Sequence, residues 1–462
     1  MLFNSLEFAL FLPITLLVYH GVIPRRFWRA RKGFLVVASY LFYMSWNPFF
    51  GLLLLGSTLI DFTMGLLLER TSSLAARRML LLVSLAFNLG MLGYFKYGSF
   101  VATNVYELLG RADPPPWDIL LPVGISFYTF ESLAYTINVY RGERASRSLL
   151  DFSLFLSFFP HLVAGPIVRP RAFLPQCDAP AVIPGHDVEL ALARIAQGFL
   201  KKVLLADVLG QYVDAVWKDL PYYPGLNVLL AFYAYAFQIY FDFSGYTDIA
   251  LGVSKLFGFT LPENFDRPCL ARNAREFWQR WHMSLSTWLR DYLYISLGGN
   301  RISQRRTYVN LFLTMVLGGL WHGAAWTFVL WGAYHGALLV VHRLREERGG
   351  SATPRFGPVL AQIGTFHLVV LGWVLFRAPS LGDAIAALGR LAVPGWTTTR
   401  AASEALILVI VAVLLHHAPR AADVQARFVR MSPVAQGVLY AAATVVAFFI
   451  APASERFIYF QF

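Results

Sequence analysis

The sequence predicts an all-α integral membrane protein, with about eleven transmembrane helices and further re-entrant or interfacial helices. The 462-residue chain is 57% hydrophobic and only 14% charged, and its mean hydropathy is +0.53. A soluble domain could not bury that much apolar sequence in one core. Long apolar runs recur from one end of the chain to the other, and a helix needs about 20 such residues to cross about 30 Å of hydrocarbon. A helix is expected for each run because it satisfies its own backbone groups in lipid.

The apolar runs follow one another without a soluble domain between them, so a single polytopic membrane domain is expected over residues 1–462. The first run has no basic leader or small-residue cleavage site and is expected to be a retained helix. Two runs, 33–45 and 308–321, are short for a crossing and are expected to be re-entrant or buried. Stretches 113–117 and 176–186 are turn-rich connectors. The runs lie near 6–23, 33–45, 48–69, 79–97, 118–140, 149–168, 190–217, 225–258, 308–321, 324–343, 357–377, 404–417 and 433–452.

The net charge of +12 fits a membrane protein and gives no reason to expect a nucleic-acid partner. Basic residues gather in the short stretches 25–32, 70–78 and 141–147, which follow the first, third and fifth apolar runs. Cytoplasmic loops carry such an excess of Lys and Arg, so the N-terminus is predicted to lie outside. The location predicted is the cytoplasmic membrane of a bacterium, with several passes.

The stretch 262–306 is more polar than its neighbours, and its part from 273 to 294 predicts one amphipathic helix. Apolar and aromatic residues recur there at spacings of one, three and four, which suits a helix at the interface or beside a cavity. Arg275, Arg280 and Arg290 lie off the apolar stripe. They could meet lipid phosphates or bind an anionic donor, and a solvated role is the alternative.

Metal, disulfide and nucleotide chemistry are not supported. The two cysteines, Cys177 and Cys269, are expected to be unpaired. No H-E-x-x-H motif occurs, and His322 and His335, 13 residues apart, would be separated by about 20 Å on one helix. Walker and G-x-G-x-x-G motifs are absent, as is the G-x-S-x-G elbow of a serine hydrolase.

Two of the ten histidines stand in matching contexts, Trp281-His282 and Trp321-His322. Small residues flank His322, which permits close approach by another backbone or a ligand. An imidazole is well suited to proton abstraction near neutrality, and burial keeps it neutral. A hydrogen-bonded core histidine remains an equal alternative for both. Further histidines within or beside apolar sequence are His161, His335 and His367.

Carboxylates also occur inside apolar sequence, where they must be paired or line a cavity. Asp242 and Asp248 could orient a histidine or bind an arginine such as Arg275 or Arg290, or they could form structural ion pairs. The others are Asp61 and Glu131.

Three strings resemble the membrane-bound O-acyltransferase (MBOAT) family, and within it the bacterial branch that includes the membrane component of alginate O-acetylation. They are FWQRWHMSLSTWLRDYLY at 277–294, LGGNR at 297–301 and GGLWHG at 318–323. Supporting strings are GISFYTF at 124–130, YTINVYRG at 135–142, FPHLVAGPIVR at 159–169, the cluster at 242–248 and FIYFQF at 457–462.

The resemblance implies helices around a central tunnel, with His322 at its narrow point and His282 at the family's second polar position. It implies an O-acetyltransferase that uses acetyl-CoA as donor substrate, without a bound cofactor or metal. A hydroxyl of an extracytoplasmic polysaccharide would be the acceptor, reached through a partner protein with a nucleophilic serine. A D-alanyl transferase of teichoic acids, supplied by a carrier protein, and a proton-coupled transporter are the alternatives.

Four positions depart from the pattern that the resemblance leads us to expect, and none of them is a motif histidine. Ser296 stands where proline is usual, and Asn138 where aspartate is common. Glu131 and His161 both stand where glutamine is common.

Overall fold

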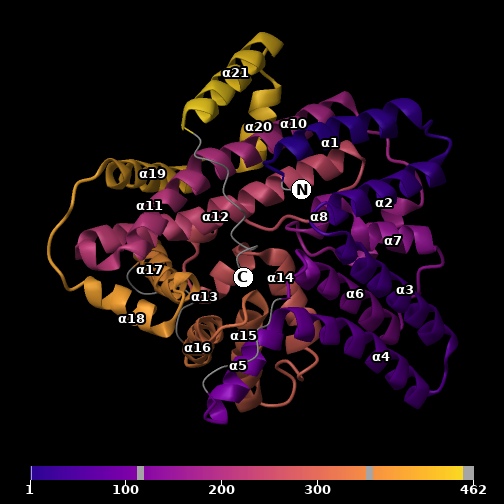
Figure 1. Ribbon diagram of the computed structural model, residues 1–462, viewed down its shortest axis with the longest axis horizontal. Coiled ribbons are helices and arrows are strands. Elements are labelled where there is room, and N and C mark those ends of the chain that lie inside the picture. Colours follow the sequence, from indigo (N-terminus) through magenta and orange to yellow (C-terminus); the bar gives the residue numbers. More distant parts are fainter. Residues whose placement is uncertain (2, 112–118, 350–356, 451–462) are drawn as a thin grey trace. The chain divides into compact units, whose positions relative to one another are not determined.

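The computed structural model describes residues 1, 3–111, 119–349 and 357–450, and every regular element in these ranges is a helix (Figure 1). The predicted all-α class is therefore confirmed. Five helical stretches are long and apolar enough to cross a membrane. The total of about eleven crossings stays a prediction, and the connector at 113–117 and the string at 457–462 lie outside the described residues. The five stretches are Pro48–Arg70, Leu74–Leu108, Gly225–Leu256, Pro358–Arg377 and Arg400–His417.

The chain divides into two compact units, the first made of residues 1–191 and 250–262 and the second of 192–249 and 263–462. The single domain predicted from the sequence stays a prediction. Helices of the first unit are α1 (Leu6–Leu17), α2 (Trp28–Met44), α3 (Pro48–Arg70), α4 (Leu74–Leu92), α5 (Gly98–Leu108), α6 (Ile125–Tyr140), α7 (Leu149–Ser157), α8 (Phe159–Leu162) and α9 (Pro170–Phe173). Helix α10 (Gly185–Leu200) begins in the first unit and ends in the second.

The second unit holds the histidine motifs. Its helices are α11 (Asp207–Lys218), α12 (Gly225–Leu256, whose last residues belong to the first unit), α13 (Ala274–Arg280), α14 (Met283–Trp288), α15 (Gln304–His322), α16 (Trp326–Glu347), α17 (Pro358–Arg377), α18 (Leu381–Arg390), α19 (Arg400–His417), α20 (Ala421–Val429) and α21 (Pro433–Ile450). Short π-helical turns at 201–206 and 289–294 extend α10 and α14.

Asp61 joins three helices in the first unit. Its carboxylate on α3 accepts hydrogen bonds from Ser84 and Asn88 on α4 and from Ser132 and Thr136 on α6. All five side chains are buried. A buried carboxylate is tolerated where donors satisfy its oxygens, so this cluster fixes the register of α3, α4 and α6.

Helices α15 and α16 form a tight hairpin in the second unit. A Cβ atom on Gly319 would lie 2.2 Å from the Phe328 carbonyl oxygen, and one on Gly332 would lie 2.3 Å from that of Met315. The close approach predicted for the small residues around His322 is therefore an approach between two backbones. The short apolar run 308–321 is part of α15, because polar residues at 304–307 extend the helix.

The predicted single helix over 273–294 is wrong. Helix α13 ends at Arg280 and α14 begins at Met283, with Trp281 and His282 between them. His282 has a φ of 43°, in the left-handed region that breaks an α-helix. The spacing of apolar residues continues across residues 281–282, so it predicts one helix. Hydrogen bonds from another segment determine the backbone conformation at these two residues.

Candidate active site

His282 lies in a turn that a neighbouring segment holds in place. The backbone N–H of Asp266 donates to the Arg280 carbonyl oxygen, and the Met283 N–H donates to the Asn264 carbonyl oxygen, both over 3.0 Å. The segment 264–266 thus runs alongside both ends of the turn. This pairing supports the left-handed backbone at His282, a conformation that few non-glycine residues adopt.

The His282 ring is fully buried. It packs perpendicular to Phe243 of α12, with ring centroids 4.6 Å apart, and its centroid lies 6.2 Å from that of Trp321. Burial lowers the pKa of His282 to about 3, so the imidazole is neutral at ordinary pH. A neutral ring is the form that can accept a proton.

His322 ends α15 and is 4% exposed. Aromatic rings surround it: the centroids of Trp321, Trp331 and Phe376 lie 5.0, 5.1 and 5.3 Å from its own. Because the Trp321 ring also contacts His282, the structure brings the two motif histidines together around one indole.

The other apolar-context histidines occupy different surroundings. His335 of α16 is buried, and neither ring nitrogen has a hydrogen-bond partner among the described residues. It packs against Trp331, which links it to His322. His161 belongs to the first unit and faces Glu131, while His367 meets the Tyr233 hydroxyl on an exposed face of α17.

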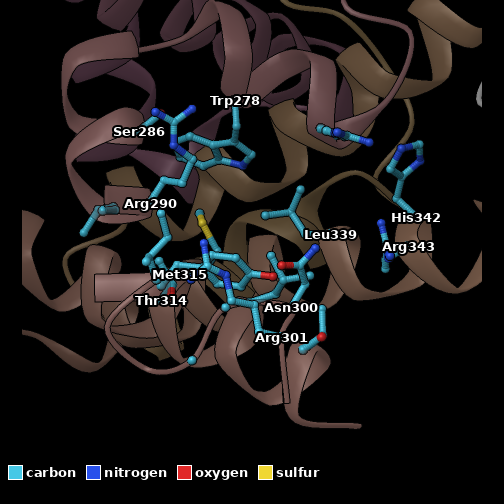
Figure 2. A pocket seen from close by; sticks show the side chains of 18 of the residues that line it. Trp278, Ser286, Arg290, Asn300, Arg301, Thr314, Met315, Leu339, His342 and Arg343 are labelled. Carbon is cyan, nitrogen blue, oxygen red and sulfur yellow. The ribbon is translucent and has the colours of Figure 1, made fainter. Parts of the chain in front are cut away.

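A cavity of about 440 Å³ opens beside α14 and is lined by arginines (Figure 2). We call it the arginine pocket. Of the residues predicted to bind the donor, it contains Arg275 and Arg290, whose side chains are 57% and 62% exposed. Arg301 and Arg343 line it too, and Glu346 is the one carboxylate among its lining residues. Trp278 contributes an aromatic wall (Figure 2).

Arg280 does not line the arginine pocket. Its guanidinium pairs with Glu276 at 2.8 Å and donates to the Asp266 carbonyl oxygen at 3.2 Å. Arg275 lies five residues earlier on the same helix, about 140° away around its axis, so the two side chains leave α13 on different faces.

A second cavity of about 380 Å³, which we call the polar pocket, lies on the other flank of the His282 turn. Met283 and Phe265, the neighbours of His282 and Asn264 in sequence, form part of its wall. Helix α14 therefore begins at the polar pocket, and its Ser286 lines the arginine pocket together with Leu289 of the π-helical turn that follows. Hydroxyl and charged side chains also line the polar pocket: Tyr240, Ser244, Thr247, Asp248, Glu263, Asp266, Arg194, Lys201, Arg267 and Arg420.

Asp242 and Asp248 form ion pairs with neither Arg275 nor Arg290. Asp242 meets Lys202 at 2.8 Å, and Lys202 also meets Asp207 at 2.6 Å. Asp248 lies between Arg194 at 3.1 Å and Lys201 at 2.6 Å. Of the two readings from the sequence, structural ion pairing is the one that these contacts support.

Sequence reasoning passed over Asn264, Arg301 and Arg343. Asn264 lies in the string PENFDRP at 262–268, whose polarity inside a membrane protein was a usable signal. Arg301 ends the string LGGNR, which carries the resemblance but was given no role of its own, and Arg343 stands in a basic stretch typical of cytoplasmic loops. Both cysteines are free, as expected, and the described residues contain no cluster that could hold a metal ion.

The chain is similar in sequence to known proteins. A sequence model of the "MBOAT, membrane-bound O-acyltransferase family" matches residues 64–347. The chain is 45% identical over 391 residues to "Probable alginate O-acetylase AlgI" of Pseudomonas aeruginosa, covering 82% of this chain and 73% of the relative. It is 36% identical to the peptidoglycan O-acetyltransferase of Helicobacter pylori, covering 77% and 72%. It is 31% identical to the teichoic acid D-alanyltransferase of Bacillus subtilis, covering 59% and 73%.

These matches confirm three predictions made from the sequence: the family, an O-acyltransferase activity, and a multi-pass protein of the bacterial cytoplasmic membrane. The relatives carry acyl transfer to cell-surface polymers in their names. The chain belongs to the membrane-bound O-acyltransferase family.

Proposed function

We propose that the protein transfers an acetyl group from acetyl-CoA toward hydroxyls of an extracytoplasmic polysaccharide, by way of a partner protein with a nucleophilic serine. One observation carries the proposal: two buried histidines meet at one indole, and α14, which begins directly after His282, reaches both a pocket rich in arginine and a pocket rich in hydroxyl and charged side chains. The names of the alginate and peptidoglycan relatives favour acetyl as the acyl group and a glycan as the acceptor.

The arginine pocket suits the donor. Acetyl-CoA carries phosphates, which guanidinium groups bind through two parallel hydrogen bonds. Four arginines against one carboxylate give the pocket a positive field. Arg275 and Arg290 are the two on the amphipathic segment, and the thioester arm would extend from them along α14 toward the histidines.

His322 would act as the general base. It takes the proton of the acceptor hydroxyl while the hydroxyl oxygen attacks the thioester carbonyl. The carbon–sulfur bond then breaks, and the departing thiolate takes the proton and leaves as the free thiol of CoA. His282 orients the reactants or shares the proton, and the polar pocket admits the hydroxyl-bearing molecule.

His322→Ala tests the catalytic step. Membranes from a strain in which the variant replaces the wild-type chain are given radiolabelled acetyl-CoA, and label on the polysaccharide fraction is counted. We expect a loss of at least about 100-fold. His416→Ala is the matched control, because His416 is also buried among aromatic rings but packs against Phe237, Tyr240 and Phe241 and not against a motif histidine. Full transfer by His322→Ala at normal protein abundance would remove this role.

Arg290→Ala tests the donor site. The variant should raise the apparent KM for acetyl-CoA several-fold at unchanged protein abundance, since one phosphate contact is lost. Arg305→Ala, on an exposed residue that does not line the pocket, is the control. An unchanged KM for Arg290→Ala would exclude a phosphate contact there.

The similarity to teichoic acid D-alanyltransferases supports one alternative, in which a carrier protein and not free CoA brings the acyl group. Transfer from acetyl-CoA without any added cytosolic protein would exclude it. A proton-coupled transporter would move solute without forming an acylated product.

A further inference from the structure

The Asn264 side chain is the hydrogen-bonding centre of the His282 turn. Its Oδ1 atom lies 3.1 Å from the backbone nitrogen of Ser284, 2.9 Å from Ser284 Oγ and 3.1 Å from Nδ1 of His282. Asn264 and His282 are both 0% exposed. These are direct contacts, and Asn264 lies 18 positions before His282 in the sequence.

These contacts fix the proton on the imidazole. A backbone N–H can only donate, so the amide atom facing the Ser284 nitrogen must be the oxygen of Asn264. An amide oxygen can only accept, so His282 Nδ1 must carry a hydrogen. In the neutral ring the other nitrogen, Nε2, is then left with its lone pair.

We infer that Asn264 is a positioning residue, which holds the His282 ring in the tautomer whose Nε2 can accept a proton. The inference rests on the proposed role of His282 and adds the group that selects its protonation pattern. A side chain that fixes tautomer and orientation from behind the imidazole serves the same purpose in other histidine-dependent enzymes. Asn264 also holds the turn, because its backbone carbonyl accepts from Met283.

The charged groups around this pair are already engaged. On the segment of Asn264, Glu263 pairs with Arg194, and Asp266 and Arg267 lie near each other. On α13, Arg280 pairs with Glu276, and on α12, Asp242 and Asp248 pair with lysine or arginine. His322 of α15 is the titratable group reached through Trp321. The variants of Asn264 described next leave all of these charged and titratable groups in place.

The experiment compares Asn264→Asp with Asn264→Leu in the membrane assay with radiolabelled acetyl-CoA, measured as a function of pH. Aspartate keeps an acceptor for all three donors. Its negative charge favours the imidazolium form of His282, so the acidic limb of the rate–pH profile should move up by about one pH unit or more. Leucine offers no acceptor and should reduce transfer at least about 100-fold.

Asn227→Asp is the matched control, because Asn227 is equally buried and bonded to Thr397 in the same unit, away from both motif histidines. The acidic limb of the rate–pH profile of Asn227→Asp should stay at the wild-type pH. An unmoved limb in Asn264→Asp, or transfer within about twofold of wild type in Asn264→Leu, would overturn the inference. If Asn264→Leu does not accumulate in membranes, the inference is tested by the acidic limb of Asn264→Asp alone. Asn264→Asp can serve as the test because it keeps an acceptor for every donor.

His282→Ala separates this inference from the proposed function. If His282→Ala transfers acetyl at the wild-type rate, the role of His282 fails, and the inference fails with it. If His282→Ala is inactive while Asn264→Asp keeps the wild-type limb, only the positioning role of Asn264 is lost.

Discussion

Glu131 and His161 form a buried pair, and the cost of replacing Glu131 should depend on the residue at position 161. Oε1 of Glu131 accepts from the Val168 N–H at 2.8 Å, and Oε2 lies 3.4 Å from His161 Nε2. The same Nε2 lies 2.9 Å from the Phe155 carbonyl oxygen, which only accepts, so Nε2 carries a hydrogen. Both side chains are 1% exposed.

Glu131→Gln alone should destabilise the protein. If the glutamine oxygen keeps the bond from Val168, its NH₂ group faces the Nε2–H of His161, donor against donor. A buried donor left without an acceptor costs about 1–3 kcal/mol. His161→Gln alone should cost less, because the amide NH₂ group can replace Nε2–H as a donor to the Glu131 carboxylate. With both replaced, two amides offer a donor and an acceptor to each other.

The assay is the apparent melting temperature of the detergent-solubilised protein for wild type, both single variants and the double variant. We expect the double variant to be more stable than the sum of the single effects predicts, with a coupling energy of about 1–2 kcal/mol. Glu131→Gln combined with Asn138→Ala is the control, because seven residues of α6 separate these positions by about 10 Å and their effects should add. Additive effects for Glu131 and His161 would refute the reasoning.

Three further changes test the packing. Asp61→Leu removes the acceptor of four buried donors and should lower the melting temperature and abundance of the solubilised protein, by about 3–5 kcal/mol of stability; an unchanged melting temperature would contradict this. Gly319→Ala places a Cβ against the Phe328 carbonyl and should cost about 1–3 kcal/mol and reduce acetyl transfer, whereas Gly90→Ala, with no atom within 4 Å, should do neither. Lys202→Met leaves two buried carboxylates facing each other, so the protein should lose about 3–5 kcal/mol or fail to accumulate, and wild-type abundance would exclude a structural ion triad.

Much of the fold could be predicted because lipid imposes simple rules. Apolar length identified α3, α12, α17 and α19, and small residues identified the α15–α16 contact. The break at His282 could not be found in this way. It depends on hydrogen bonds from residues 264–266, and periodicity within 273–294 carries no information about them.

Some residues of the candidate site could likewise be predicted from the sequence, and others could not. Matching Trp-His motifs marked His282 and His322, because an imidazole in apolar sequence is rare and costly. Arg280 was grouped with Arg275 and Arg290 because all three lie off the apolar stripe, but its guanidinium pairs with Glu276 outside the arginine pocket. The polarity of the string 262–268 was a signal for Asn264, but nothing in the sequence pointed to the three donors that reach its side chain.

The rings around His322 have a consequence for reaction fidelity. An activated thioester can be lost to water as well as passed to a hydroxyl, and a general base beside it would assist both reactions. Trp321, Trp331 and Phe376 leave His322 4% exposed, so bulk water would have little access to the general base proposed here. Under the proposed function, this aromatic enclosure would favour transfer over hydrolysis, and a smaller side chain at Phe376 should shift the balance toward futile release of free acetate.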